Sequence, residues 1–157
     1  MGNIIFFYTK EDKPMLNILD VAQFFLSLES MNHKKLQKLC YYAQAWYLAL
    51  KGVPFMNTWF EAWVHGPVSP ELYTRYRSWG GLMIPQNSYR GNMVEEQKDF
   101  LRKIYSLYGN YSGNELERLT HLEMPWQKAR KGYSSDAICT ETISNDDMGS
   151  FYREYLH

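Results

Sequence analysis

The chain has 157 residues, a length at which one domain with a single hydrophobic core is stable without metals or disulfides. It carries 17 basic and 17 acidic side chains, and this neutral balance argues against a general binder of nucleic acid or of anionic membranes. Aromatic residues make up 17% of the sequence, and such rings serve both cores and interfaces.

Residues 1–14 are predicted to form an arm or short strand ahead of a single domain over residues 15–157. The apolar run from Ile4 to Tyr8 is too short for a secretory signal or a membrane span. The two cysteines, Cys40 and Cys139, lie far apart, and Cys40 falls on an apolar helical face that suits a reduced thiol. We therefore expect a cytoplasmic protein without a membrane partner.

The first two helices have clear starting signals. Asn17 can cap a helix that ends near Ser30, and Asn32 can cap a second one over about residues 33–51, which Gly52 stops. Apolar residues recur every three or four positions in this second segment, which predicts an amphipathic helix at the centre of the fold. The side that we expect to be exposed carries Lys34, Lys38, Tyr41, Gln44 and Lys51.

A short strand or extended segment is predicted from Thr58 to His65, because β-forming residues alternate there with smaller or polar ones. A tight turn follows, in which Gly66 supplies backbone freedom, Pro67 and Pro70 fix φ, and Ser69 caps the next helix. We expect the nearby tryptophans to be mostly core, with one ring exposed; they are Trp59, Trp63 and Trp79.

The second half of the chain predicts further helices separated by glycine and proline signals. Together with the central helix they indicate a mainly α fold with a few short β-strands, arranged as a compact single-domain bundle. The predicted elements are a helix from Ser69 to the Gly80-Gly81 pair, a loop or small strand near residues 82–84, a helix over residues 95–108, a helix capped by Ser112, a short helix at Pro125 and a last helix capped by Ser144.

The sequence carries no recognisable catalytic or metal-binding set. Its four histidines lack the short spacings of a zinc site, and the common nucleotide-binding and hydrolase motifs are missing. His65 could act as a general base, but we assign it to hydrogen bonding with backbone that fixes the turn. His121 beside Glu123 is assigned to packing or capping, because adjacent helical positions do not face each other. No metal and no cofactor is therefore expected.

A short stripe of lysines on the central helix raises the possibility of nucleic-acid binding as an alternative function. Lys34, Lys35 and Lys38 could contact phosphates, with Tyr41 and Tyr42 nearby to stack bases. Three lysines on one helix of a neutral protein more often form a solvated face. Nucleic-acid binding therefore stays an alternative behind protein binding.

Two segments of the chain form a distinctive combination. The first is the helical stretch KLQKLCYYAQAWYLA at residues 35–49, and the second is FEAWVHGPVSPELY at residues 60–73. LERLTH at residues 116–121 and the Pro-Trp pair at residues 125–126 extend the pattern. Together they resemble the Panacea domain, the SocA-like antitoxin family, whose members are also known as GepA-like or phage-associated proteins.

This resemblance implies a mainly helical protein that binds and neutralises a cognate protein toxin. Some members deliver the toxin to an ATP-dependent protease as adaptors, whereas others bind and block it. We expect protein binding without catalysis; the alternative is a phage or mobile-element protein with enzymatic or nucleic-acid-binding activity. The expected contact surface combines the turn with the exposed side of the central helix and comprises Lys34, Lys38, Tyr41, Trp63, His65, Gly66, Pro67, Val68 and Ser69.

Overall fold

The computed structural model describes residues 14–156, which are mostly helical, so the predicted mainly α class with a few short strands is confirmed. Residues 1–13, which hold most of the predicted arm, lie outside the described residues. The helical elements are α1 (Ile18–Leu28), α2 (His33–Lys51), α3 (Pro70–Tyr76), the 3₁₀ helix η1 (Arg77–Trp79), α4 (Glu95–Tyr108), α5 (Gly113–His121), α6 (Met124–Ala129) and α7 (Asn145–Arg153).

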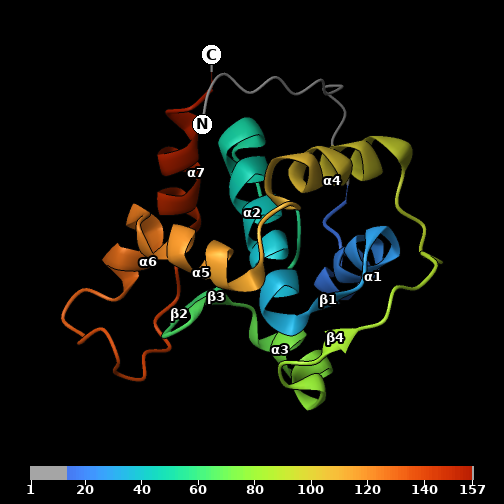
Figure 1. The fold of residues 1–157 in the computed structure, drawn as a ribbon. Helices are drawn as coiled ribbons and strands as arrows, with labels where there is room; N and C mark the ends of the chain where they lie inside the picture. The colour runs from blue at the N-terminus through green and yellow to red at the C-terminus, as the bar shows by residue number, and fades with distance from the viewer. Residues whose placement is uncertain (1–13, 157) are drawn as a thin grey trace.

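Helix α2 is the centre of the fold. Figure 1 shows it in the middle of the molecule, with α6 and α7 on one side and α1 and α4 on the other. It packs most extensively against α7 and next against α5, and it also contacts α1, α3 and α4. This arrangement confirms the prediction that the segment around residues 33–51 organises the bundle.

Local capping signals set the helix starts as the sequence predicts. The Asn17 side chain accepts a hydrogen bond from Leu19 N, and the Asn32 side chain accepts one from Lys35 N. Ser112 and Ser144 cap α5 and α7 in the same way. Each cap satisfies an amide that has no partner within its helix, so the signal is readable from a few adjacent residues.

The expectation of an exposed polar side on α2 is wrong for Lys38, Tyr41 and Gln44. These three side chains are buried, whereas Lys34 and Lys51 are half-buried. The cause is that packed elements surround α2, so its polar side is covered as well as its apolar side. Amphipathic periodicity marks the better core face of a helix, but it does not show what covers the other face.

The buried polar residues of α2 hold neighbouring loops in place. Gln44 Oε1 accepts hydrogen bonds from Phe55 N at 2.9 Å and Met56 N at 2.8 Å, and its Nε2 donates to Met56 O at 3.0 Å. Gln37 forms a similar pair with Ser69, accepting from its N at 2.9 Å and donating to its O at 3.2 Å. These side chains satisfy loop backbone groups that have no ladder partner.

A β-hairpin replaces the predicted single strand and turn. Strand β2 (Glu61–Trp63) pairs antiparallel with β3 (Gly66–Val68), and the register Trp63↔Gly66 leaves Val64 and His65 as a two-residue turn. The predicted strand from Thr58 to His65 is therefore too long, and part of the predicted turn is itself a strand. A second short pair joins β1 (Met31–Asn32) to β4 (Met83–Ile84).

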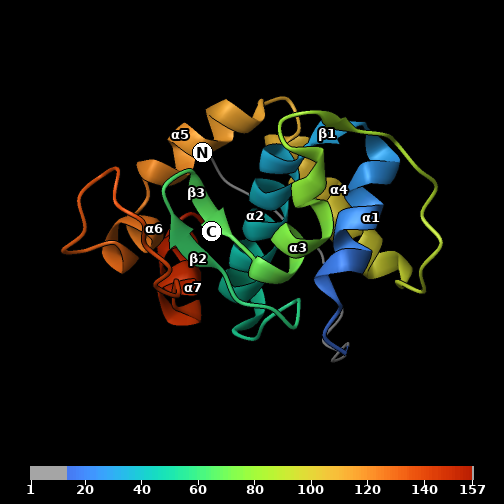
Figure 2. The same cartoon turned by 90° about the horizontal axis from the view of Figure 1, so that it is seen from below.

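The hairpin lies across the N-terminal half of α2. Figure 2 shows β2 and β3 in front of α2, between α3 and the pair formed by α5 and α6. Strand β3 contacts α2 and α5, and β2 contacts α6. Thr142, far along the chain, adds an isolated bridge to Glu61. The hairpin is thus fixed on several sides and presents its turn to solvent.

The expectation of one exposed tryptophan ring is confirmed by Trp59, which is 52% exposed. The expectation that the other two lie in the core is wrong, because Trp63 and Trp79 are half-buried, although Trp79 packs against the core. The buried tryptophans are Trp46 and Trp126. Tyrosine supplies much of the remaining aromatic core, since Tyr41, Tyr42, Tyr108 and Tyr152 are all buried.

Both cysteines are free and buried, which confirms the reduced, packed thiol expected at Cys40. Burial raises the pKa of the Cys40 thiol, so this group stays neutral. Over residues 14–156, no helix combines the length and the apolar character that crossing a membrane requires.

Candidate functional site

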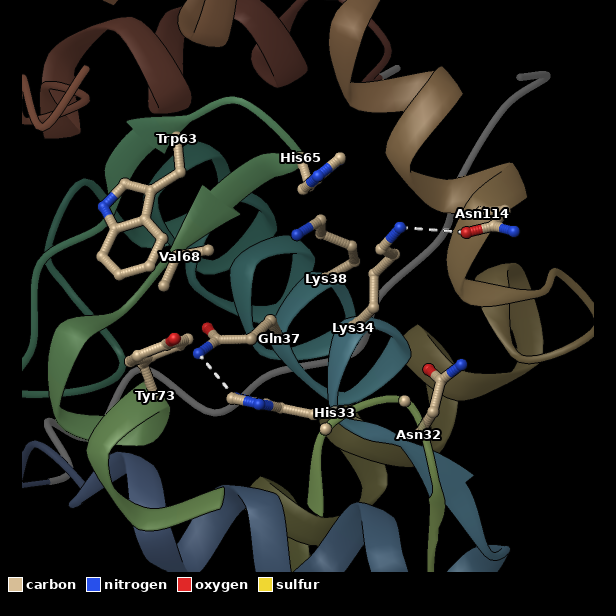
Figure 3. A pocket seen from close by; sticks show the side chains of 12 residues that line it. Asn32, His33, Lys34, Gln37, Lys38, Trp63, His65, Val68, Tyr73 and Asn114 are labelled. Atoms are coloured by element: carbon tan, nitrogen blue, oxygen red, sulfur yellow. Dashed lines mark hydrogen bonds between the residues drawn. The ribbon is translucent and has the colours of Figure 1, made fainter. Parts of the chain in front are cut away.

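A cavity of about 420 Å³ opens beside the hairpin, where α2, α3 and α5 meet. Five of the residues that the sequence singled out line it, namely Lys34, Lys38, Trp63, His65 and Val68. Figure 3 shows their side chains arranged around it, together with His33, Gln37, Tyr73 and Asn114. The fold therefore brings the central helix and the turn together in one site.

The other predicted contact residues are part of the scaffold. Tyr41 is buried with its ring edge-on to Phe60, at a centroid distance of 5.4 Å. Gly66 and Pro67 are buried in β3. Ser69 is also buried, where its hydroxyl caps α3 and lies 2.8 Å from the Thr58 hydroxyl. These residues shape the hairpin rather than present side chains to a partner.

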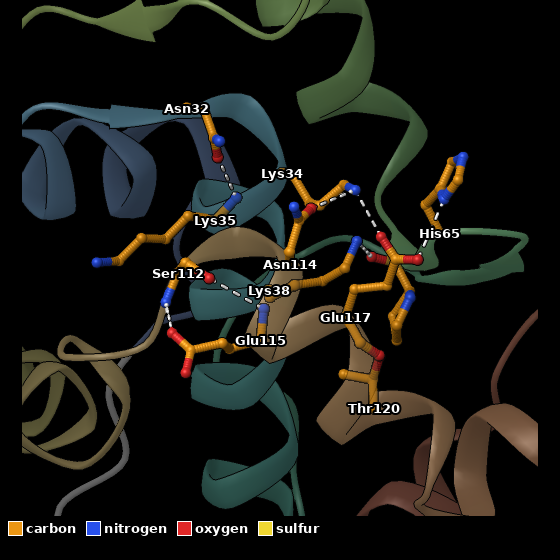
Figure 4. Close-up of polar contacts among 11 residues, drawn as sticks. Asn32, Lys34, Lys35, Lys38, His65, Ser112, Asn114, Glu115, Glu117 and Thr120 are labelled. Carbon is orange, nitrogen blue, oxygen red and sulfur yellow. Dashed lines mark hydrogen bonds and ion pairs between the residues drawn. The ribbon is translucent and has the colours of Figure 1, made fainter.

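Glu117 of α5 is the acidic centre of the site. Its carboxylate lies 2.5 Å from Lys34 Nζ and 3.2 Å from His65 Nδ1, and Figure 4 shows it between the two. Lys34 Nζ also donates to Asn114 Oδ1 at 3.0 Å. Burial opposes ionisation of Glu117, but the hydrogen bonds and charges of Lys34 and His65 outweigh it and hold its pKa below the usual value.

Lys38 lies beneath the hairpin as a buried amine. Its side chain is 1% exposed, and Nζ donates to Pro67 O at 3.2 Å. Burial lowers the pKa of Lys38 to about 7, with Glu117 opposing and Lys34 reinforcing the shift. Gly66, at φ 104°, leaves room for it, since a Cβ there would lie 2.6 Å from Lys38 Cε.

The floor of the cavity is neutral. The Gln37 amide nitrogen lies 3.2 Å from His33 Nε2, and because an amide nitrogen only donates, that ring nitrogen accepts. Burial lowers the pKa of His33 to about 4, and the charge of Lys38 adds to the shift. His33 is therefore an uncharged imidazole at neutral pH, and the charged groups gather at the rim around Glu117.

A second, mainly apolar cavity of about 320 Å³ lies on the other side of the hairpin. It shares Trp63, His65 and Val68 with the first, so the hairpin forms a ridge between the two cavities. Its far wall carries Ile138, which is 87% exposed. The Arg130 guanidinium donates to Ser134 O, Ala137 O and Ala62 O, and so ties the loop that carries Ile138 to β2.

The structure overturns the role predicted for His65 and confirms the one predicted for His121. His65 was expected to bond backbone and fix the turn, but its side chain is 70% exposed and bonds the Glu117 carboxylate instead. The two-residue turn and the pairing of β2 with β3 fix the corner without it. His121 stacks on Trp126 at 4.0 Å, which confirms packing, and Glu123 bonds Tyr42 and Tyr152 instead.

The lysine stripe is not a solvated face. Lys35 Nζ is turned away to Gly109 O at 2.7 Å and Glu29 Oε1 at 3.1 Å, and Lys38 is buried under the hairpin. Only Lys34 reaches the surface in part, and Glu117 neutralises it. The stripe cannot present three charges to a phosphate backbone.

Comparison with known proteins decides the family. The family model described as "Antitoxin SocA-like, Panacea domain" matches residues 36–127, which is more than half of the chain. The chain belongs to this family. It is also 26% identical over 128 residues to "Antitoxin SocA" of Caulobacter vibrioides (strain NA1000 / CB15N), a match that covers 70% of this chain and 68% of that protein. No solved structure matches it.

The Panacea match spans the core of the site but not all of it. Residues 36–127 contain most of α2, the hairpin and Glu117. Lys34 and Ile138, which form parts of the two cavity walls, lie outside the matched segment. The scaffold of the site is thus a feature of the Panacea domain, whereas both flanks are contributed by other parts of this chain.

Sequence reasoning missed Glu117, Asn114 and Ile138. Glu117 stands within the quoted LERLTH segment, yet its partner His65 is 52 positions earlier, and no local spacing links them. Asn114 and Glu117 are three positions apart and share the face of α5 that contacts Lys34 of α2. This spacing of two polar residues is the sequence pattern that could have indicated them. No pattern in the sequence marks Ile138.

Proposed function

We propose that this chain is a cytoplasmic antitoxin that neutralises a cognate protein toxin by binding it directly, without catalysis. Membership of the Panacea family supports an antitoxin role, as does the name of the relative, Antitoxin SocA. The observation that carries the proposal is the hairpin ridge between a polar and a mainly apolar cavity. Such a surface can anchor apolar side chains of a protein partner and orient them by polar contacts.

The residues around this ridge have the character of a protein interface. Trp59, at 52% exposure, and Trp63 hydrogen-bond the Glu61 carboxylate through their indole nitrogens. Tyr73 packs edge-on against Trp63 at 4.8 Å. Partly exposed tryptophan and tyrosine rings held by hydrogen bonds lose little entropy on binding, and these residue types dominate interface energetics. Ile138 adds an exposed aliphatic side chain on the opposite side of the hairpin, in the wall of the apolar cavity.

Co-expression with the protein encoded by the neighbouring gene tests the proposal. We expect that protein to arrest growth alone, and this chain to restore growth and to form a stable complex with it after purification. A neighbour that is harmless alone, or whose toxicity this chain leaves unchanged, would contradict the proposal. If no neighbour is toxic, the antitoxin role fails in the same experiment.

Blocking and delivery to a protease make opposite predictions for the toxin's lifetime. We favour blocking, because the ridge offers a direct binding face, whereas delivery needs a second surface for the protease. The expected result is a stable complex and a toxin half-life that does not change when this chain is present. A half-life that shortens, and lengthens again in cells without the ATP-dependent protease, would establish delivery instead.

One observation favours a second candidate, an enzyme that uses His65. The contact of His65 Nδ1 with Glu117 at 3.2 Å resembles the carboxylate support that orients a histidine base. His65→Ala with full neutralisation of the toxin would remove this candidate. Complete loss of neutralisation with unchanged toxin binding would support it and contradict the non-catalytic proposal.

A further inference from the structure

A buried carboxyl group stands apart from the hairpin site, at the N-cap of α6. Glu123 is 9% exposed, and both Tyr42 and Tyr152 donate their hydroxyls to its Oε1, at 2.8 and 2.6 Å. Within residues 14–156 its second oxygen, Oε2, accepts no hydrogen bond. Oε2 is not a buried atom without a partner, so it is accessible at the cavity wall and can accept a hydrogen bond from a ligand.

Glu123 is also part of a cavity wall. A cavity of about 240 Å³ lies between the end of α4, helix α5 and helix α7. Four tyrosines and two leucines surround the single carboxyl, and no lysine or arginine is among the lining residues. These residues are Leu107, Tyr108, Tyr111, Leu119, Glu123, Tyr152 and Tyr155.

We propose that this cavity binds a small organic cation, an alkylammonium or guanidinium group, between the accessible rings of Tyr111 and Tyr155 and the Glu123 carboxylate. The faces of aromatic rings carry negative electrostatic potential and attract cations within about 6 Å of the ring centre. A carboxylate with a free oxygen supplies the matching charge and a hydrogen-bond acceptor. One carboxyl among apolar rings suits an organic cation better than a hard metal ion, which needs several oxygen ligands.

The electrostatics of Glu123 link its ionisation to this cation. Burial raises the pKa of Glu123 to about 7, and the hydroxyls of Tyr152 and Tyr42 oppose the shift without cancelling it. A bound cation favours the ionised carboxylate, so binding releases a proton near neutral pH. We therefore expect affinity to rise with pH up to about 7 and then level off.

Among residues 14–156, no other group that faces Glu123 titrates in that range. The groups that face it are the phenols of α2, α4 and α7, and burial raises the pKa of each well above its usual value; they are Tyr41, Tyr42, Tyr108 and Tyr152. His121 is close in sequence, but the charges that act on it are those of Glu117, Lys38 and His65 at the hairpin. The pH dependence of cation binding thus reports on Glu123.

Titration of the purified chain with tetramethylammonium and n-butylammonium, with n-butanol as the neutral comparison, tests this site by NMR or calorimetry. We expect saturable binding of both cations and none of butanol. Tyr111→Ala, at an exposed wall position, is expected to weaken binding about two- to fivefold, as loss of one cation–π contact at an exposed site predicts. Tyr133→Ala is the matched control, because Tyr133 is equally exposed at 43% but lies outside the cavity.

Glu123→Gln keeps the size of the side chain and removes its charge. We expect it to weaken binding of tetramethylammonium about tenfold or more and to abolish the rise in affinity between pH 5 and pH 7. Absence of saturable cation binding, equal binding of butanol, or unchanged affinity in Tyr111→Ala would overturn the proposal. Tyr111→Ala decides the matter if Glu123→Gln does not fold.

The source of the cation is resolved by a second comparison. N-acetyl-lysine methylamide represents a protein side chain, and n-butylammonium represents a free amine. Tighter binding of the first would indicate recognition of a protein segment, and tighter binding of the second would indicate a small-molecule ligand. The inference does not depend on the antitoxin role, because these titrations use the purified chain alone and toxin neutralisation is measured separately.

Discussion

At the scale of single residues, Gly66 and Lys38 form a fitted pair. Gly66 has φ 104°, a conformation that side chains other than glycine's rarely adopt, and an added Cβ would lie 2.6 Å from Lys38 Cε. We predict that Gly66→Ala lowers the free energy of unfolding by about 2 to 4 kcal/mol, measured by chemical denaturation. Gly81→Ala, where a Cβ would meet nothing within 4 Å, is the control and should change stability by less than about 1 kcal/mol.

Lys38 should make stability depend on alkaline pH. Its pKa is lowered to about 7 in the folded chain from 10.5, so the unfolded chain binds more protons between these values. Stability therefore rises with pH from about 7 to 10.5, by up to about 1.4 kcal/mol per pH unit. Denaturation across this range should show the rise in the natural chain and a flatter profile in Lys38→Met. Parallel profiles for the two proteins would contradict this account of Lys38.

At the scale of elements, the helices could be predicted from the sequence because their signals are local. Caps such as Asn32 and Ser112 act within one turn, and the bounds predicted for residues 95–108 are those of α4. Strand β3 was missed, because its conformation depends on pairing with β2 and not on the sequence Gly66–Val68 alone. The burial of Lys38 likewise depends on the hairpin that covers it.

We also predict the stability cost of removing a buried polar side chain from α2. Gln44 satisfies the backbone groups of Phe55 and Met56 while fully buried. Gln44→Leu keeps much of the volume but leaves these amides without a partner, which should lower the free energy of unfolding by about 2 to 5 kcal/mol. Gln23→Leu, at a partly exposed position of α1, should cost less than about 1 kcal/mol. Equal costs for the two variants would contradict the proposed role of Gln44.

At the scale of the whole molecule, the candidate site exists only in the assembled fold. Lys34 and His65 were both expected at a contact surface, but Glu117, which joins them, comes from a helix much later in the chain. The loop that carries Ile138 completes the opposite wall. Sequence reasoning could therefore locate the turn and the central helix, whereas the two cavities follow from contacts between distant segments.

One exposed residue at the hairpin ridge and one at the C-terminal end of α2 can be compared by making the same substitution at each. Ile138 lies beside the hairpin and Val53 follows the C-terminal end of α2, and both are exposed β-branched side chains. The hairpin covers Lys38, and the 13 residues of α2 that follow Lys38, up to its end at Lys51, span about 20 Å at 1.5 Å per residue. Aspartate at either position adds the same charge, but only one of the two positions lies at the proposed interface.

The most direct test of direct toxin binding at the hairpin is the dissociation constant for the toxin, measured by calorimetry with these two variants. We predict that Ile138→Asp weakens binding about tenfold or more, as loss of an apolar contact at an interface implies, and that Val53→Asp changes it less than about threefold. Unchanged affinity in Ile138→Asp, or equal weakening by Val53→Asp, would contradict the assignment of the hairpin ridge as the toxin-binding face.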